Sequence, residues 1–137
     1  MTIKEAALVA HILKEEIEDN KNIYSQEMYV NKLQKIVESG VSNASLSDLS
    51  MIFSVINNKE REYRSKYLAA KEQYEKAKNE YERFDKELKE RDADVLMTKE
   101  EIEKYGTLSI SLIRAMDYYH DIKGKYEDYK EASEIEF

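Results

Sequence analysis

The 137-residue chain has no proline, no cysteine and no tryptophan, and it has only three glycines. Average soluble chains carry about 5% proline and about 7% glycine, so this scarcity of turn-forming residues argues against hairpin-rich β folds. The absence of cysteine excludes a disulfide framework, a thiolate zinc site and a cysteine nucleophile. The composition therefore favours an all-α fold.

Long apolar runs are also missing, and positive charge is in deficit. The longest run, from Ala6 to Ala10, is far too short to span a bilayer, and no signal-peptide pattern precedes it. The formal net charge is -7, whereas contacts to phosphate groups require a surplus of lysine and arginine. We therefore expect a cytoplasmic protein that binds neither a membrane nor, directly, nucleic acid.

Residues 1–43 carry the signals of two short amphipathic helices. Thr2 and Glu5 form a capping-box pattern that begins the first helix. The second helix is expected to begin at Ser25 and to end at Gly40, where a left-handed C-terminal cap is favoured. Because neither helix is stable alone, residues 1–43 are predicted to form an N-terminal helical pair.

The clearest signal in the chain is a heptad stripe that runs from about Ser45 to Arg91 without glycine or proline. Apolar or tyrosine side chains recur with alternating spacings of three and four residues, which is typical of a coiled-coil helix. The stripe positions are Leu46, Leu49, Phe53, Ile56, Glu60, Tyr63, Tyr67, Ala70, Tyr74, Ala77, Tyr81, Phe84, Leu88 and Arg91, and only Glu60 and Arg91 break the apolar pattern. One long helix is predicted over this segment.

A matching stripe follows a break at Asp92-Ala93-Asp94. Thr98 and Glu101 form a second capping box, after which the stripe comprises Tyr105, Leu108, Leu112, Ala115, Tyr119, Ile122, Tyr126 and Tyr129. Two complementary stripes joined by a short link predict a long antiparallel coiled-coil hairpin over residues 44–137, with its tip at about 92–97. The expected register places Ala77 near Leu112, Ala70 near Tyr119, and Tyr63 near Tyr126.

Two features of the sequence leave it undecided where the second hairpin helix ends. Gly106 and Gly124 could each end or kink it, because glycine in a helix costs about 1 kcal/mol relative to alanine. The strongly acidic stretch from Glu127 to Glu136 is expected to fray.

Two acidic patterns resemble metal-binding motifs. Asp117 and His120 have the spacing of the carboxylate-x-x-histidine half-motif of di-iron bundles. Glu15 and Glu18 have the Glu-x-x-Glu spacing that all-helical nucleotide pyrophosphohydrolases use to hold magnesium, which would imply a metal-dependent nucleotide hydrolase. The second half that each motif requires is absent at the expected distance. We therefore expect no catalytic residues, no metal, no cofactor and no enzymatic activity.

An apolar patch is predicted on the outer side of the second hairpin helix. It consists of Ile110, Ile113, Met116 and Tyr118, and the acidic residues Asp92 and Asp94 lie at the hairpin tip. Such a patch must be covered by the N-terminal helices, by a second copy or by a partner. The leading interpretation is a non-enzymatic protein-protein interaction module that binds another protein through these residues.

Composition gives this interpretation a concrete form. The lysine-rich, proline-free sequence is typical of AT-rich bacterial or phage genomes, so one form is a small phage or mobile-element protein that inhibits or regulates a host protein, including a nucleic-acid-binding one. The alternative is a scaffold or packaging subunit that oligomerises through the coiled coil. A homo-oligomer such as a swapped dimer would preserve the predicted stripe contacts.

Overall fold

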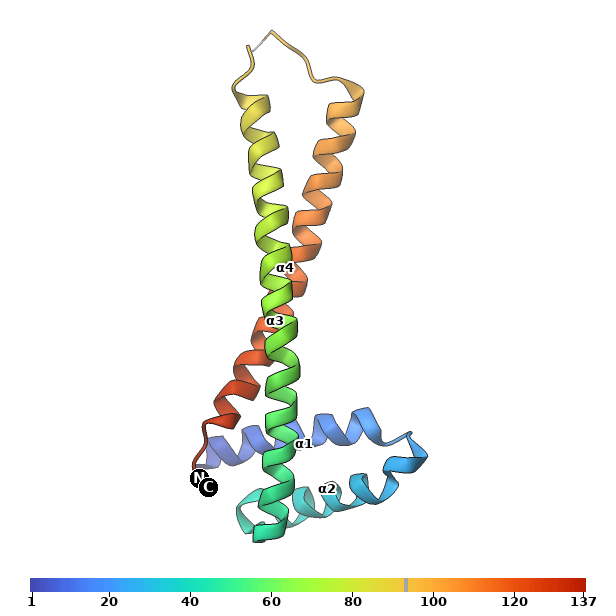
Figure 1. Cartoon of the computed structure of the whole chain (residues 1–137), viewed down its shortest axis with the longest axis vertical. Helices are drawn as coiled ribbons and strands as arrows, with labels where there is room; N and C mark the ends of the chain where they lie inside the picture. Colours follow the sequence, from blue (N-terminus) through green and yellow to red (C-terminus); the bar gives the residue numbers. More distant parts are fainter. Residues whose placement is uncertain (93) are drawn as a thin grey trace. The chain divides into compact units, whose positions relative to one another are not determined.

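The computed structural model describes residues 1–92 and 94–137, and these residues form helices and connecting turns with no β-strand (Figure 1). Ala93, which the sequence places in the polar break, lies outside the described residues. The helical segments, in which η denotes a 3-10 turn, are α1 (Ile3–Asn20), η1 (Tyr24–Gln26), α2 (Glu27–Ser39), η2 (Val41–Asn43), α3 (Leu46–Lys89) and α4 (Lys99–Ser133). The prediction of an all-α fold, with a short helical pair followed by a long antiparallel hairpin, is confirmed.

The helices begin where side chains satisfy their free amides. The Thr2 hydroxyl accepts from the Glu5 amide at 3.0 Å, and the Glu5 carboxylate accepts from the Thr2 amide at 2.8 Å. Thr98 and Glu101 repeat this exchange at the start of α4, at 3.1 and 2.9 Å. Both predicted capping boxes are thus confirmed, and each contributes about 1 kcal/mol to its helix. The second helix begins two residues later than expected, because η1 occupies the turn before Glu27.

The three glycines play two different roles. Gly40 ends α2 with φ 89° and ψ 130°, a positive φ that side chains other than glycine rarely adopt. Gly106 and Gly124 lie inside α4, which continues through both to Ser133. Neither glycine ends the helix, because the packed stripe on the opposite face of α4 outweighs the propensity cost of about 1 kcal/mol.

The expectation that the acidic C-terminal stretch frays is wrong. Tyr129, Ala132 and Ile135 are buried, and α4 remains helical to Ser133. Their spacing of three residues places them on one face of the chain, and the acidic residues between them remain exposed. Burial of this apolar face holds the segment in place despite its charge.

The fold divides into two compact units. Unit 1 comprises Met1–Arg64 and Lys125–Phe137, and unit 2 comprises Ser65–Gly124. The N-terminal pair therefore shares a unit with the start of α3 and the end of α4. The domain boundary expected between residues 43 and 44 stays a prediction.

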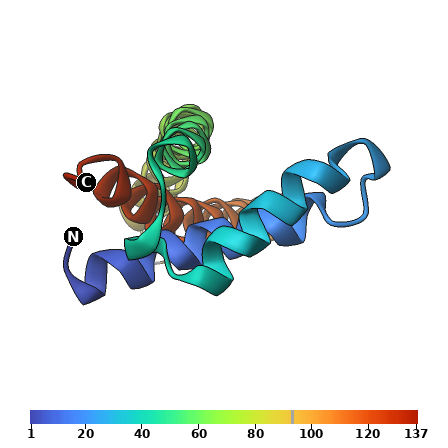
Figure 2. The same cartoon turned by 90° about the horizontal axis from the view of Figure 1, so that it is seen from below.

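Unit 1 contains the larger hydrophobic core. Figures 1 and 2 show α1 and α2 side by side and antiparallel within this unit. The fully buried side chains that meet there are Val9, Ile12, Leu13, Leu33, Ile52, Ile56 and Tyr129. The chain termini lie together as well, because Met1 and Phe137 line the same shallow depression and the rings of Phe53 and Phe137 meet edge to face at 4.8 Å. Unit 1 is thus held by side chains from all four long helices.

Unit 2 is a two-helix hairpin with a narrow seam. Its three buried hydrophobic residues, among those described, are Ala70, Phe84 and Ile122. The Tyr119 ring stacks on Tyr74 at 5.2 Å and on Tyr67 at 5.8 Å, which brackets Ala70 and agrees with the expected register. Two packed helices cover only their facing sides, so the outer faces of unit 2 stay open to solvent.

Candidate interaction surface

The residues singled out from the sequence on α4 lie on its outer half. Ile110 and Ile113 are each 52% exposed, Tyr118 is 48% exposed and Met116 is half-buried. At about 100° per residue, Ile110 and Ile113 share one side of the helix, whereas Met116 and Tyr118 flank that side in opposite directions. The structure therefore brings Ile110 and Ile113 together and does not bring Tyr118 into the same strip.

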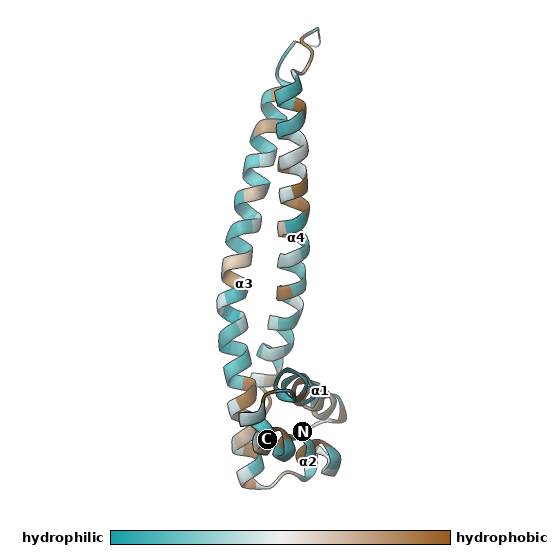
Figure 3. Cartoon of the chain, turned by 90° about the vertical axis from the view of Figure 1, so that its right-hand side faces the viewer, coloured by the Kyte–Doolittle hydropathy of each residue, from teal (hydrophilic) through white to brown (hydrophobic). Residues whose placement is uncertain are grey.

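The structure extends this surface to a residue that sequence reasoning missed. Ile102 is 58% exposed, and it precedes Gly106, Ile110 and Ile113 with spacings of four, four and three residues. These four residues line one face of α4 and are called the α4 strip below. Figure 3 shows hydrophobic colour recurring along this part of α4. The same helical spacing could have revealed Ile102 in the sequence, but Ile102 precedes the stripe that begins at Tyr105.

The loop between α3 and α4 adds a second apolar element. Val95, Leu96 and Met97 are exposed, with Leu96 at 85%, and Asp92 and Asp94 lie beside them. The Asp92 carbonyl accepts from the Val95 amide at 3.0 Å. Exposed apolar side chains in a loop have no stabilising role in the hairpin seam, so they are available for contacts with another molecule.

An ion pair closes the base of this loop. The Arg91 guanidinium lies 2.9 Å from the Glu101 carboxylate, which also caps α4 through Thr98. The hydrogen bond from the Thr98 backbone, together with Arg91, lowers the pKa of Glu101 below its ordinary value. Both hairpin helices are thereby tied at the ends from which the loop emerges.

The stripe tyrosines of unit 2 face the seam, whereas Tyr118 does not. The hydroxyl oxygens of Tyr81 and Tyr105 lie 2.7 Å apart, and Tyr105 also donates to Asp85 at 3.4 Å. The hydrogen bond with Tyr81, together with desolvation, raises the pKa of Tyr105 to about 12. A hydrogen bond with Tyr67 likewise raises the pKa of Tyr119. These tyrosines therefore stabilise the hairpin, as the core interpretation of the stripe expected.

Glu15 and Glu18, which resembled a magnesium motif, are engaged within unit 1, as is the adjacent Glu16, and Glu18 forms an ion pair with Lys21. Glu15 accepts from the Tyr129 hydroxyl at 2.7 Å and lies 2.8 Å from His11 Nε2. Glu16 lies 3.2 Å from the ammonium of Lys59, which is buried, and accepts from Tyr29 at 3.2 Å. The carboxylates of Glu15 and Glu16 thus provide partners for buried hydrogen-bond donors within unit 1.

His120, the other candidate metal ligand, lies beside aromatic rings. Its ring centroid is 5.3 Å from that of Tyr119 and 6.4 Å from that of Tyr74. Across residues 1–92 and 94–137, no three histidine, aspartate or glutamate side chains are grouped closely enough to hold a metal ion. The Asp117 and His120 pair therefore lacks the further ligands that a di-iron site needs.

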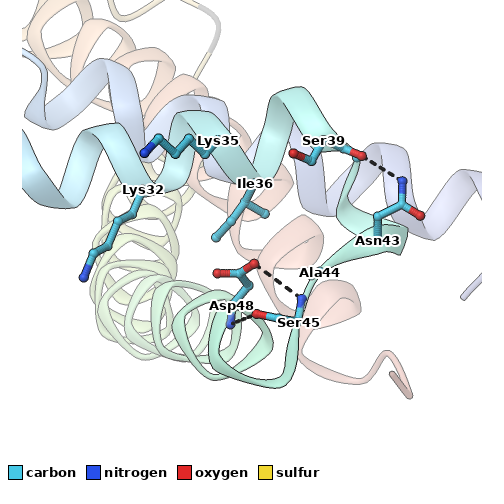
Figure 4. Close-up of a pocket in the computed structure, with 9 residues that line it drawn as sticks. Lys32, Lys35, Ile36, Ser39, Asn43, Ala44, Ser45 and Asp48 are labelled. Atoms are coloured by element: carbon cyan, nitrogen blue, oxygen red, sulfur yellow. Dashed lines mark hydrogen bonds between the residues drawn. The ribbon is translucent and has the colours of Figure 1, made fainter.

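The depressions on unit 1 are shallow and are lined by both polar and apolar side chains. The one in Figure 4 has a volume of about 260 Å³ and lies between α2 and the start of α3, with Lys32 and Lys35 at its edge. Its carboxylate, Asp48, accepts from the Ser45 amide at 3.4 Å, and the Ser45 hydroxyl accepts from the Asp48 amide at 3.2 Å. Asp48 thus acts as a capping residue for α3.

Comparisons with known proteins identify no relative. No protein-family model matches the chain, and neither a curated protein nor a solved structure matches it significantly. In the described part of the chain, no helix combines the length and the apolar character needed to cross a membrane.

Proposed function

We propose that this chain is a non-enzymatic protein-protein interaction module that binds through the exposed apolar side chains of unit 2. The observation that carries the proposal is the exposure of the α4 strip and of the neighbouring loop residues Val95, Leu96 and Met97. Monomeric proteins rarely leave a large contiguous apolar patch open to water, and such patches mark interaction sites.

The surface combines apolar and charged side chains. Ile110 and Ile113 supply apolar area, and the exposed Tyr118, which flanks the α4 strip on the same helix, offers an aromatic ring of the kind enriched at binding hot spots. Asp92 and Asp94 give the loop a negative charge, which favours a partner with a basic rim. A small phage or mobile-element protein that inhibits or regulates a host protein would use a surface of this kind.

A capture experiment tests the proposal. The tagged chain, at low concentration, is incubated with lysate of its source cells, and retained proteins are quantified by mass spectrometry. Leu96→Asp alters the loop and Ile110→Asp alters the α4 strip, while Thr107→Asp adds the same charge at an exposed position of α4 outside the strip. We expect one host protein to be retained by the parent chain and by Thr107→Asp, and to fall at least tenfold with Leu96→Asp or Ile110→Asp.

The captured protein is then purified and titrated against each variant by calorimetry, so that binding is measured directly. Equal capture by all four chains would contradict the proposed surface. If only further copies of the chain are retained, in large assemblies by light scattering, the scaffold or packaging function is favoured instead.

A further inference from the structure

The α4 strip is apolar along its length but has a gap at its centre. Ile102, Ile110 and Ile113 are each more than half exposed. Between Ile102 and Ile110 lies Gly106, where an added side-chain carbon would meet no atom within 4 Å. A glycine on an open helix face allows another backbone to approach closely. The strip thus offers three apolar side chains and one recess.

Exposed charges frame the strip in a definite order. Lys99 and Glu103 lie at its N-terminal end, and Arg114 and Asp117 lie at its C-terminal end. All four side chains are exposed, and at about 100° per residue they project from the same outer half of α4 as the strip. Along the helix, the signs therefore run positive, negative, positive, negative.

This order is self-complementary when two copies of α4 run antiparallel. With the twofold axis at about Leu108, Lys99 lies opposite Asp117 of the second copy, and Glu103 lies close to Arg114 of the second copy. The same alignment places Gly106 opposite Ile110, and Ile102 close to Ile113. A parallel pairing would instead set each charge beside its own equivalent, which is repulsive. The charges and the recess thus select the same arrangement.

We propose that a second copy of this chain packs antiparallel on the α4 strip and forms a twofold-symmetric dimer. Such an interface is isologous, so each charge pair occurs twice. The inference rests on the proposed function, because it names a second copy as the partner of one part of the unit 2 surface. The loop residues Val95, Leu96 and Met97 lie outside the dimer contact, and the α4 strip is open to the host protein at the low concentrations at which the dimer dissociates.

The surface area that the two α4 helices bury against each other limits the affinity of the dimer. A single helix seam is smaller than the roughly 800 Å² per partner that is usual in stable complexes. We therefore expect a dimer that forms at high micromolar concentration and dissociates on dilution. Its formation should be sensitive to salt, because the framing charges are exposed.

A charge exchange tests the dimer and its register. Sedimentation equilibrium over a range of concentrations is measured for the parent chain, Lys99→Glu, Asp117→Lys and the double variant Lys99→Glu/Asp117→Lys. Each single variant sets like charges opposite each other twice, so we expect the dimer to weaken at least tenfold. The double variant restores opposite charges and should restore the dimer.

Two controls separate this result from general effects. Lys71→Glu changes the net charge equally at an exposed position of α3 and should leave the dimer unchanged. Lys99→Glu adds an acidic side chain to the first turn of α4, which favours the helix through its dipole, so loss of the dimer cannot be attributed to loss of the helix.

Gly106→Gln fills the recess and should also abolish dimerisation while helix content is kept.

The inference is overturned if the parent chain is monomeric at every concentration, if it forms larger assemblies, or if the double variant is no better than the single variants. These measurements use the purified chain alone. The proposed function is instead judged by the loss of a host protein on Leu96→Asp, so the failure of either can be recognised separately.

Discussion

The hydroxyl of Tyr129 donates a hydrogen bond of 2.7 Å to the carboxylate of Glu15, joining the last helix to the first. Tyr129 is 1% exposed, and its ring meets Tyr63 edge to face at 4.9 Å. The ammonium of Lys59 lies 5.6 Å from the centre of the same ring. One side chain thus connects α1, α3 and the end of α4 within unit 1.

Replacement of Tyr129 by phenylalanine tests this connection. The ring and its packing remain, whereas the hydrogen bond to an ionised carboxylate is lost, so we expect the free energy of unfolding to fall by about 1–2 kcal/mol. Urea denaturation followed by circular dichroism measures the change. Tyr24→Phe is the matched control, because Tyr24 is 90% exposed and its replacement should change stability by less than about 0.5 kcal/mol. Equal effects of the two substitutions would show that the bond to Glu15 contributes nothing.

Alanine substitutions at Gly124 and Gly40 are expected to change the free energy of unfolding in opposite directions. Gly124→Ala should raise the free energy of unfolding by about 1 kcal/mol, because Gly124 is helical and the added carbon meets nothing within 4 Å. Gly40→Ala should lower stability by about 1–2 kcal/mol, because φ at Gly40 is 89°. Thermal or urea unfolding of the two single variants measures both changes. Stabilisation by Gly40→Ala would mean that the turn after α2 does not require a positive φ.

The hydrogen bond between Tyr81 and Tyr105 predicts that the stability of the fold falls at alkaline pH. The pKa of Tyr105 is raised from 10.0 to about 12, first by the hydrogen bond with Tyr81 and then by desolvation. The folded chain therefore holds this proton more tightly than the unfolded chain does. The resulting stability is fully present below pH 10 and is lost as the pH rises through about 12.

NMR of chains with isotope-labelled tyrosine rings measures this titration directly. In Tyr81→Phe the main cause of the shift is removed, so the pKa of Tyr105 should move back towards 10.0. Tyr118→Phe is the control, since Tyr118 lies on the outer half of α4 and its replacement should leave the Tyr105 titration unchanged. A Tyr105 titration near 10.0 in the parent chain would contradict the hydrogen bond in the seam.

Local patterns in the sequence were sufficient to predict the helices. The capping boxes at Thr2 and Thr98 use residues three positions apart, so their hydrogen bonds follow from local geometry. The heptad spacing likewise identified the seam, and Ala70 lies between two tyrosines that stack on Tyr119 as the register required. Such features can be read without a structure because they depend on neighbours along the chain.

The candidate surface was predicted only in part. Ile110 and Ile113 were identified because they lie off the seam, but Ile102, which is 58% exposed, was missed because it precedes the stripe that begins at Tyr105. Tyr118 was grouped with them because it also lies off the stripe, although the rotation of the helix places it on another side. Which apolar residues form one surface is therefore a property of helix geometry as well as of composition.

The sequence by itself determined an all-α chain with two long complementary stripes, because turn-forming residues are scarce and apolar spacing fixes which side of a helix is buried. The tertiary structure alone decided that the acidic C-terminal stretch is ordered and that Glu15 and Glu16 bind Tyr129 and Lys59. These contacts join residues far apart along the chain, and their stability comes from desolvation and burial, which exist only when the helices meet.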